Sequence, residues 1–228
     1  MKKIFIACDT SKITKIKKII KYSKSNKIKI GYKIGLEFFY SPKGRAFVAK
    51  IKNNYIFLDL KLNDIPNTCV SAIESLRDLK NINYLTVHIN GGFEMLKQIK
   101  KTAKRINKNL KILGVTVLTS LNNESIKKIG YTKSIKNLVV HQAKLAKKAG
   151  LDGVVCSGRE VFLIKKICKK MEIITPGIRI DKDLMQDQKR IMTPALAFKY
   201  GATGLVIGRS ITKGNIKNNI QRLVKSLN

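Results

Sequence analysis

The chain has 228 residues with 47 basic and 14 acidic side chains, a formal net charge of +33, and this length suffices for one domain, predicted to span residues 1–228. No apolar run is long enough to span a membrane, and the run 4–8 is shorter than the about 7–15 apolar residues of a secretion signal. The four cysteines form no Cys-x-x-Cys pair and adjoin no histidine cluster, which disfavours a metal site and a disulfide framework and predicts a cytoplasmic protein with reduced cysteines.

Eight apolar runs typical of buried strands alternate along the chain with amphipathic segments. The predicted strands are 4–8, 28–34, 55–60, 84–89, 112–118, 153–156, 173–175 and 204–207. The segments between them repeat apolar residues at helical spacing, and the last covers 216–227. Eight strand–helix units predict an α/β fold, a single (β/α)8 TIM barrel. A doubly wound open sheet is the alternative, although the Gly-x-Gly-x-x-Gly of a Rossmann sheet is missing.

The basic charge is spread over the predicted helices. Lysine supplies 39 of the 47 basic residues, with runs in 12–27, 97–111 and 165–170. Proteins that read bases usually use arginine, and the known nucleic-acid-binding motifs are missing. We therefore expect a solvated lysine-rich surface with weak polyanion binding and no specific nucleic-acid partner. A dedicated polyanion-binding protein is the alternative class, and salt-resistant, sequence-selective binding would distinguish it.

Polar residues and glycines lie at or just past the carboxyl ends of the predicted strands, where catalytic groups of a β/α barrel lie. They are Asp9, Lys33, Asp59 with Lys61, His88, Thr119 with Ser120, Ser157, Pro176 with Gly177 and Arg179, and Gly208 with Arg209. The densest group is in 57–65, Phe-Leu-Asp-Leu-Lys-Leu-Asn-Asp-Ile, where strand alternation separates Asp59 and Lys61 from the leucines. Because acidic residues are scarce, Asp59 and Asp64 around Lys61 predict a catalytic cluster and not a surface ion pair.

The ends of the last two predicted strands are typical of a phosphate site. Thr-Pro-Gly-Ile-Arg (175–179) and Val-Ile-Gly-Arg-Ser (206–210) place glycine N–H groups and Arg209 at the loops that bind phosphate in many β/α barrels. The polar stretch 180–190 is predicted to be a lid, with Gln188 reaching the phosphate. His88 is expected to line the pocket without transferring a proton, and His141 to be solvated.

The chain resembles the bacterial orotidine 5′-phosphate decarboxylases over nearly its whole length. The resemblance is carried by Phe-Leu-Asp-Leu-Lys-Leu-Asn-Asp-Ile-Pro-Asn-Thr (57–68), Val-Thr-Val-Leu-Thr-Ser (115–120), Leu-Asp-Gly-Val-Val-Cys-Ser (151–157), Thr-Pro-Gly-Ile-Arg (175–179), Asp-Gln-Lys-Arg-Ile-Met-Thr-Pro (187–194) and Val-Ile-Gly-Arg (206–209). It implies decarboxylation of orotidine 5′-phosphate to UMP, the last step of UMP synthesis, without a metal or organic cofactor.

The resemblance also implies a role for each site residue. Lys61 is implied as the acid that protonates C6 of the pyrimidine, with Asp59 beside the substrate carboxylate and Lys33 with Asp9 holding the ribose hydroxyls. A homodimer is implied, in which three residues enter the partner's site: Asp64, Ile65 and Thr68. The implied contacts of the pyrimidine and the phosphate are Thr119, Ser120, Pro176, Gln188, Gly208, Arg209 and, nearby, Arg179.

Two features set limits on the resemblance. The family's lid is often rich in small residues, whereas 180–186 carries three charges and the bulky Leu184 and Met185. Sugar-phosphate decarboxylases and synthases of the same barrel group share the Asp-x-Lys-x-x-Asp pattern and use magnesium. Lys33 argues against them, because those relatives place a glutamate at the end of the second strand.

Overall fold

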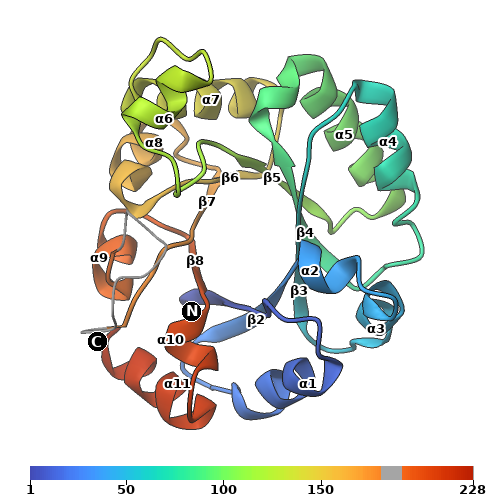
Figure 1. The fold of residues 1–228 in the computed structure, drawn as a ribbon, viewed down its shortest axis with the longest axis vertical. Coiled ribbons are helices and arrows are strands. Elements are labelled where there is room, and N and C mark those ends of the chain that lie inside the picture. Colours follow the sequence, from blue (N-terminus) through green and yellow to red (C-terminus); the bar gives the residue numbers. More distant parts are fainter. Residues whose placement is uncertain (181–191, 228) are drawn as a thin grey trace.

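Eight parallel strands close into a barrel in the computed structural model, which describes residues 1–180 and 192–227 (Figure 1). The strands follow one another around the barrel in chain order. They are β1 (Lys3–Ala7), β2 (Lys29–Gly35), β3 (Tyr55–Leu62), β4 (Ile82–His88), β5 (Lys111–Val115), β6 (Gly153–Val155), β7 (Glu172–Thr175) and β8 (Gly204–Ile207). This closed parallel sheet confirms the predicted (β/α)8 barrel.

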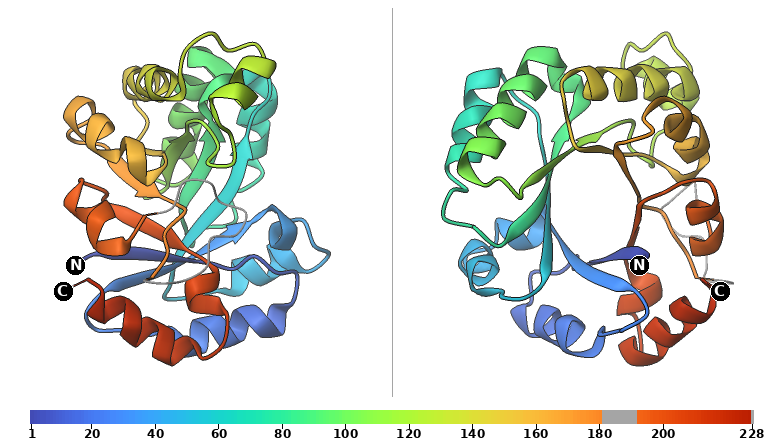
Figure 2. Two further views of the ribbon diagram at one scale, coloured as in Figure 1. Left: turned by 60° about the vertical axis from the view of Figure 1, so that its left-hand side comes forward. Right: turned by 180° about the vertical axis from the view of Figure 1, so that it is seen from behind.

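Helices cover the outside of the barrel (Figure 2). The α-helices are α1 (Ile13–Tyr22), α2 (Leu36–Phe39), α3 (Gly44–Lys50), α4 (Pro66–Glu74), α5 (Gly92–Ile106), α6 (Asn123–Lys128), α7 (Ile135–Lys148), α8 (Val161–Ile167), α9 (Pro194–Lys199), α10 (Arg209–Thr212) and α11 (Ile216–Lys225). Two short 3-10 helices are η1 (Ile89–Gly91) and η2 (Gly158–Glu160). No helix in these described segments is long and apolar enough to cross a bilayer.

Strand alternation divides the apolar core into two layers. Inside the barrel, Phe5 packs edge-on against Phe57 and Tyr84, with ring centroids 5.2 Å and 5.1 Å away. The other face of each strand packs against the helices, which present buried residues such as Ile16 and Ile19 of α1. Two apolar faces on every strand explain why the sequence reads as continuous apolar runs.

The lysines of the helices lie on the solvated side, as the spread of charge predicts. On α1, Lys17, Lys18 and Lys21 are exposed, while Ile16 and Ile19 face the barrel. The same sequence pattern therefore encodes the packing of each helix and the positive surface.

The predicted strand bounds differ from the observed ones chiefly in β5, which ends at Val115 and not at residue 118. Its neighbour β6 has only three residues, and the N–H of Thr116 makes a last bond, to the Val155 carbonyl at 3.1 Å. Beyond that point β5 has no β6 residue to pair with, so the chain turns away.

Candidate active site

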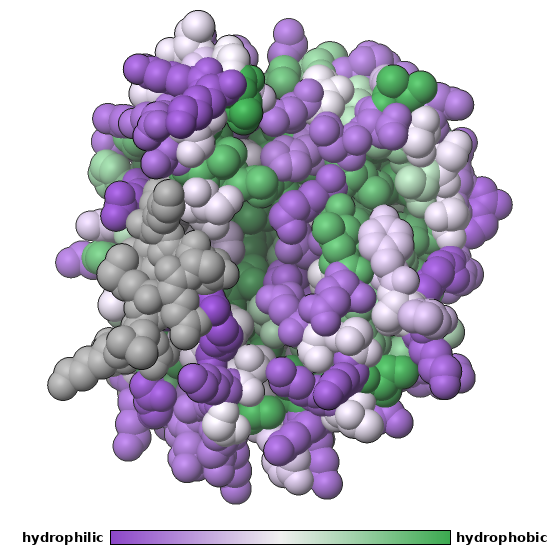
Figure 3. All heavy atoms as spheres, in the orientation of Figure 1, coloured by the Kyte–Doolittle hydropathy of each residue, from purple (hydrophilic) through white to green (hydrophobic). Residues whose placement is uncertain are grey.

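A cavity of about 580 Å³ opens among the carboxyl ends of the strands. Figure 3 shows the hollow at the centre of this face, with hydrophobic side chains in its depth and hydrophilic ones around it. Most of the predicted site residues line it: Asp9, Lys33, Asp59, Lys61, Thr119, Pro176, Arg179, Gly208 and Arg209. Strands far apart in the sequence thus bring these side chains to one place.

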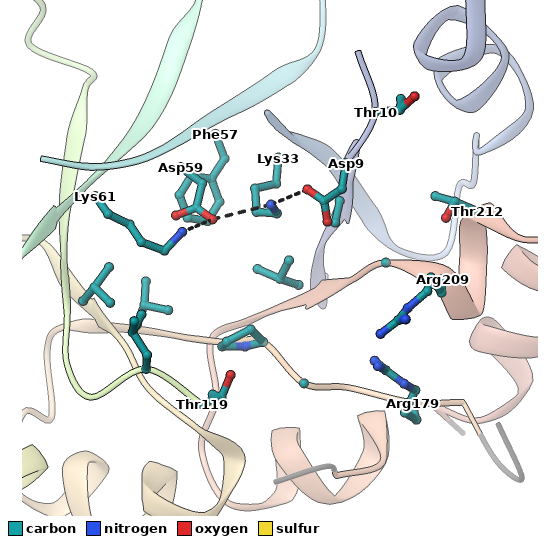
Figure 4. Close-up of a pocket in the computed structure, with 18 of the residues that line it drawn as sticks. Asp9, Thr10, Lys33, Phe57, Asp59, Lys61, Thr119, Arg179, Arg209 and Thr212 are labelled. Carbon is teal, nitrogen blue, oxygen red and sulfur yellow. Dashed lines mark hydrogen bonds and ion pairs between the residues drawn. The ribbon is translucent and has the colours of Figure 1, made fainter. Parts of the chain in front are cut away.

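Four side chains of alternating charge form a row along one wall of the cavity (Figure 4). The Lys61 ammonium lies 2.9 Å from Asp59 Oδ2, and the same oxygen lies 3.5 Å from the Lys33 ammonium. Lys33 also donates a hydrogen bond of 2.8 Å to Asp9 Oδ1. Each inner member therefore contacts two groups of opposite charge.

The row fixes the charge states of its two inner members. Burial disfavours the ionised form of Asp59, but Lys33 and Lys61 outweigh it and hold the pKa of this carboxyl below its ordinary value of 3.8. Burial likewise disfavours charged Lys33, yet Asp59 and Asp9 raise its pKa above 10.5. At neutral pH the cavity wall therefore carries a carboxylate at Asp59 and an ammonium at Lys33.

Strand β3 is irregular beside these charges. Leu58 pairs with Leu85 and Leu62 pairs with Val87, so three residues of β3 stand opposite the single residue Thr86 of β4. Extra residues of this kind form a bulge, which redirects side chains and occurs often next to active sites. The prediction of a regular strand through this segment was therefore wrong, because the backbone bulges here. The prediction that the charged side chains face inward was right.

Lys61 has a φ of 51°, the left-handed region that non-glycine residues rarely adopt and that costs on the order of 1–3 kcal/mol. Its N–H donates a hydrogen bond of 2.9 Å to Thr86 Oγ1, and this hydroxyl donates one of 3.0 Å to Asp59 Oδ1. The bulge, and not a regular strand, sets the position from which the Lys61 side chain reaches Asp59. Lys33 and Asp59 lie within β2 and β3, and so does Lys61, because β3 extends to Leu62 and does not end at residue 60 as predicted.

The floor of the cavity is apolar. It is formed by inward-facing strand residues, among them Phe57, Val115, Val155 and Val206. Thr119 lines the cavity beyond the end of β5, whereas its neighbour Ser120 is exposed and does not. An apolar floor with polar groups along one wall is typical of a small-molecule site, in which a few polar groups orient the ligand.

Two arginines stand at the end of the cavity away from Lys61. In Figure 4 the guanidinium groups of Arg179 and Arg209 point toward one another across it. Arg179 is buried, and the bridge between Ile178 and Met192 anchors its backbone. Gly208 precedes Arg209 and also lines the cavity. Converging guanidinium groups suit an anion such as a phosphate. The predicted lid 180–190, apart from Ile180, and Gln188 lie outside the described residues.

The segment just past β3 does not enter the cavity of its own chain. Asp64 is exposed and accepts a hydrogen bond of 2.7 Å from the N–H of Ile65, whose residue is 66% exposed. Thr68 on α4 is exposed as well. In the described part of the chain no ion pair joins Asp64 to Lys61. Asp64, Ile65 and Thr68, which were predicted to enter a partner's site together, thus all lie outside the cavity of their own chain.

Some pocket residues were missed by sequence reasoning. Thr10, Lys15 and Thr212 line the cavity, and Thr86 bonds two of its charged residues. Strand alternation from Tyr84 could have placed Thr86 inside the barrel. Its bonds to Lys61 and Asp59 could not be predicted, because the bulge opposite it leaves no sequence signal. Thr212 follows Arg209 by three residues in α10, the spacing of one helical face.

Neither histidine lines the cavity. His88 ends β4, and the prediction that it lines the cavity was wrong. Burial and the charge of Lys61 lower the pKa of His88. His141 is exposed on α7, as predicted. Within residues 1–180 and 192–227, no three His, Cys, Asp or Glu side chains gather where they could hold a metal ion.

The sequence and the fold both match known proteins. Residues 2–221 match the profile of the "Orotidine 5′-phosphate decarboxylase / HUMPS family". A relative from Wolbachia pipientis, named orotidine 5′-phosphate decarboxylase, is 43% identical over 232 residues and covers 100% of this chain and 99% of its own. Another of that name, from Carboxydothermus hydrogenoformans, is 44% identical over 92% of this chain and 88% of its own.

A solved structure resembles the barrel over its whole length. It is the crystal structure of orotidine 5′-phosphate decarboxylase from Lactobacillus acidophilus, with a TM-score of 0.86 and 30% sequence identity. The alignment covers 100% of both chains. The cavity and its charged row therefore lie in a fold that this solved structure shares over its whole length.

Proposed function

Because the chain belongs to the orotidine 5′-phosphate decarboxylase / HUMPS family, we propose that it uses the row of charges from Lys61 to Asp9 to decarboxylate orotidine 5′-phosphate, with Lys61 as the proton donor. The reaction itself, conversion of orotidine 5′-phosphate to UMP and carbon dioxide, is the activity of this carboxy-lyase in pyrimidine nucleotide synthesis. The observation that carries the proposal is the alternating row, with two arginines at the opposite end of the same cavity.

The chemical difficulty is the electron pair left on C6. When the bond from C6 to the carboxylate breaks, carbon dioxide leaves and the pair stays on a ring carbon that delocalises it poorly. The Lys61 ammonium supplies a positive charge where this negative charge develops, which stabilises the transition state more than the ground state. The ammonium then gives its proton to C6 and regains one from solvent.

Asp59 and Lys33 prepare the site for this step. The Asp59 carboxylate lies beside the carboxylate of the substrate, so repulsion between them is relieved as carbon dioxide leaves. Lys33 and Lys61 keep Asp59 ionised, as its lowered pKa indicates. Lys33 and Asp9, hydrogen-bonded to each other, also hold the ribose hydroxyls.

The two ends of the substrate bind at opposite ends of the cavity. The phosphate is held by Arg209 and by the Gly208 backbone, with Arg179 close by. Gln188, which lies outside the described residues, is proposed as a further contact. The pyrimidine lies on the apolar floor, with Thr119 and Pro176 at its edge. No metal or organic cofactor takes part in this scheme.

The protein is proposed to act as a homodimer of single-domain subunits in the cytoplasm. Asp64, Ile65 and Thr68 are exposed on their own chain and are free to enter a partner's site. Two exposed apolar residues, Leu36 of α2 and Tyr40 just after it, follow β2, the strand that pairs with β3. Four free buried cysteines suit a reducing compartment.

The test is the absorbance change of orotidine 5′-phosphate with purified protein and no added metal. We expect turnover that EDTA leaves unchanged, which a magnesium-dependent sugar-phosphate enzyme would not give. Lys61→Ala should abolish turnover while circular dichroism shows an intact fold. Lys128→Ala, which removes an exposed lysine paired with Glu124, is the matched control and should behave as wild type. Turnover by a folded Lys61→Ala protein would refute the role of Lys61.

A further inference from the structure

The hydroxyl of Thr86 occupies a position that the proposed mechanism does not use. Thr86 is 0% exposed and sits on β4, with its side chain turned to the inside of the barrel like Tyr84 two residues earlier. It accepts from the Lys61 N–H at 2.9 Å and donates to Asp59 Oδ1 at 3.0 Å. One buried hydroxyl therefore links the backbone of the proton donor to the carboxylate beside it.

The bulge in β3 explains why a side chain must fill this place. Between the pairs Leu58 with Leu85 and Leu62 with Val87, three residues of β3 face Thr86 alone. The N–H of Lys61, which has a φ of 51°, donates to the threonine hydroxyl in place of a ladder carbonyl of β4. Without that hydroxyl this N–H would lose its partner in a buried setting, which is unfavourable.

The second bond of Thr86 orients Asp59. With Oδ1 held by the hydroxyl, Oδ2 is the oxygen that faces both ammonium groups, Lys61 at 2.9 Å and Lys33 at 3.5 Å. A hydroxyl that accepts from one group and donates to the next polarises both bonds. The carboxylate cannot rotate away from the substrate without breaking this link.

We propose that Thr86 is a positioning residue, whose hydroxyl fixes the Asp59 carboxylate and the bulged backbone of Lys61 in the geometry that decarboxylation requires. This inference rests on the proposed roles of Lys61 and Asp59. Thr86 itself has no contact with the cavity, so its loss should slow the chemical step while leaving substrate binding in place.

The experiment compares Thr86→Val, which keeps the volume but removes the hydroxyl, with Thr86→Ser, which keeps the hydroxyl. We expect the valine variant to lower the single-turnover rate by about 10- to 160-fold, the range that corresponds to losing a hydrogen bond to a charged group. KM and the affinity for UMP should change less than about threefold, and the serine variant should stay within about threefold of wild type in all three quantities by the same reasoning.

Thr116→Val is the matched control. Thr116 is equally buried in the barrel wall, and its hydroxyl donates to a backbone carbonyl, that of Val155 at 2.9 Å. This variant should keep the wild-type single-turnover rate even where its thermal stability falls. If it slows turnover as much as Thr86→Val, the effect is general loosening of the barrel and the proposal is overturned.

Lys61→Ala in the same assay distinguishes a failure of the proposed charge network from a failure of the proposed role of Thr86. If Lys61→Ala turns over, the proposed network fails; if it is inactive while Thr86→Val turns over at the wild-type rate, only the role of Thr86 fails. Should the valine variant not fold, Thr86→Ala replaces it with the same measurements. Unfolding of both would also overturn the proposal, because it would assign Thr86 to barrel stability.

Discussion

Whether Asp64 serves its own chain or its partner can be decided by mixing two inactive variants. The perturbations are Lys61→Ala and Asp64→Asn, each expected to leave little activity when made alone. Asp64 is exposed, and its carboxylate accepts from the N–H of the next residue, Ile65. It does not line the cavity that Lys61 lines, so a role in the site requires a second chain.

The magnitude follows from two-fold symmetry. In a dimer where each site combines Lys61 of one chain with Asp64 of the other, a mixed dimer has one site with both changes and one with neither. Random pairing of equal amounts makes about half of the dimers mixed, and half of their sites are intact. About a quarter of the wild-type activity should therefore return by this isologous geometry.

The assay is decarboxylation after the two variants have exchanged subunits, with differently tagged chains to prove the exchange. A matched control uses Asp9→Asn in place of Asp64→Asn. Asp9 contacts Lys33 of its own chain at 2.8 Å and lines the same cavity as Lys61. Every site of that mixture keeps one change, so no activity should return. Proven exchange without recovery in the Asp64 mixture would refute the donation in trans.

Two further changes test the phosphate end of the cavity and the opposite face of the barrel. Arg209→Ala should lower kcat/KM by roughly 10- to 160-fold, mainly through KM, because hydrogen bonds to charged groups contribute about 1.5–3 kcal/mol; an unchanged kcat/KM for the phosphorylated substrate would contradict the assignment. Glu172 accepts hydrogen bonds from Lys3 at 2.8 Å and from Lys111. The two ammonium groups outweigh the burial of Glu172 and hold its pKa below 4.5. Its contribution to stability is therefore present above pH 4.5 and is lost as the pH falls through the folded-state pKa. Urea unfolding should therefore show Glu172→Gln about 1–3 kcal/mol less stable than wild type at pH 7, with the difference shrinking on acidification below pH 4.5; a constant difference would refute this reasoning.

The sequence predicts the barrel well because each strand is buried on both faces and each helix on one. These two periods are local and can be read without knowing any contact. The same reasoning places Asp59, Lys61 and Arg209 at one edge of the sheet, since the carboxyl ends of all parallel strands meet there. Lys33 could be assigned a strand but not its partners, because Asp9 and Asp59 reach it from the two neighbouring strands.

The bulge in β3 could not be predicted from the local sequence. Its length is set by the register between β3 and β4, a property of two segments that lie more than twenty residues apart. Thr86 gives no sequence signal of its role, since a threonine in an apolar strand is ordinary. The proposed role of Asp64 depends on a second chain, and in the sequence only the resemblance to the family points to it.

The chain's excess of positive charge bears directly on how Asp59 works. Carboxylates are scarce, and Asp59 is surrounded by two ammonium groups, as Glu172 is at the other face of the barrel. A positive field attracts a substrate that carries a phosphate and a carboxylate. In the proposed mechanism two carboxylates lie together once such a substrate is bound, and the one on the protein is held ionised by Lys33 and Lys61 and oriented by Thr86. In this mechanism the repulsion is relieved by loss of carbon dioxide from the substrate, because protonation of Asp59 would weaken its ion pairs with Lys33 and Lys61 and rotation would also break its hydrogen bond from Thr86.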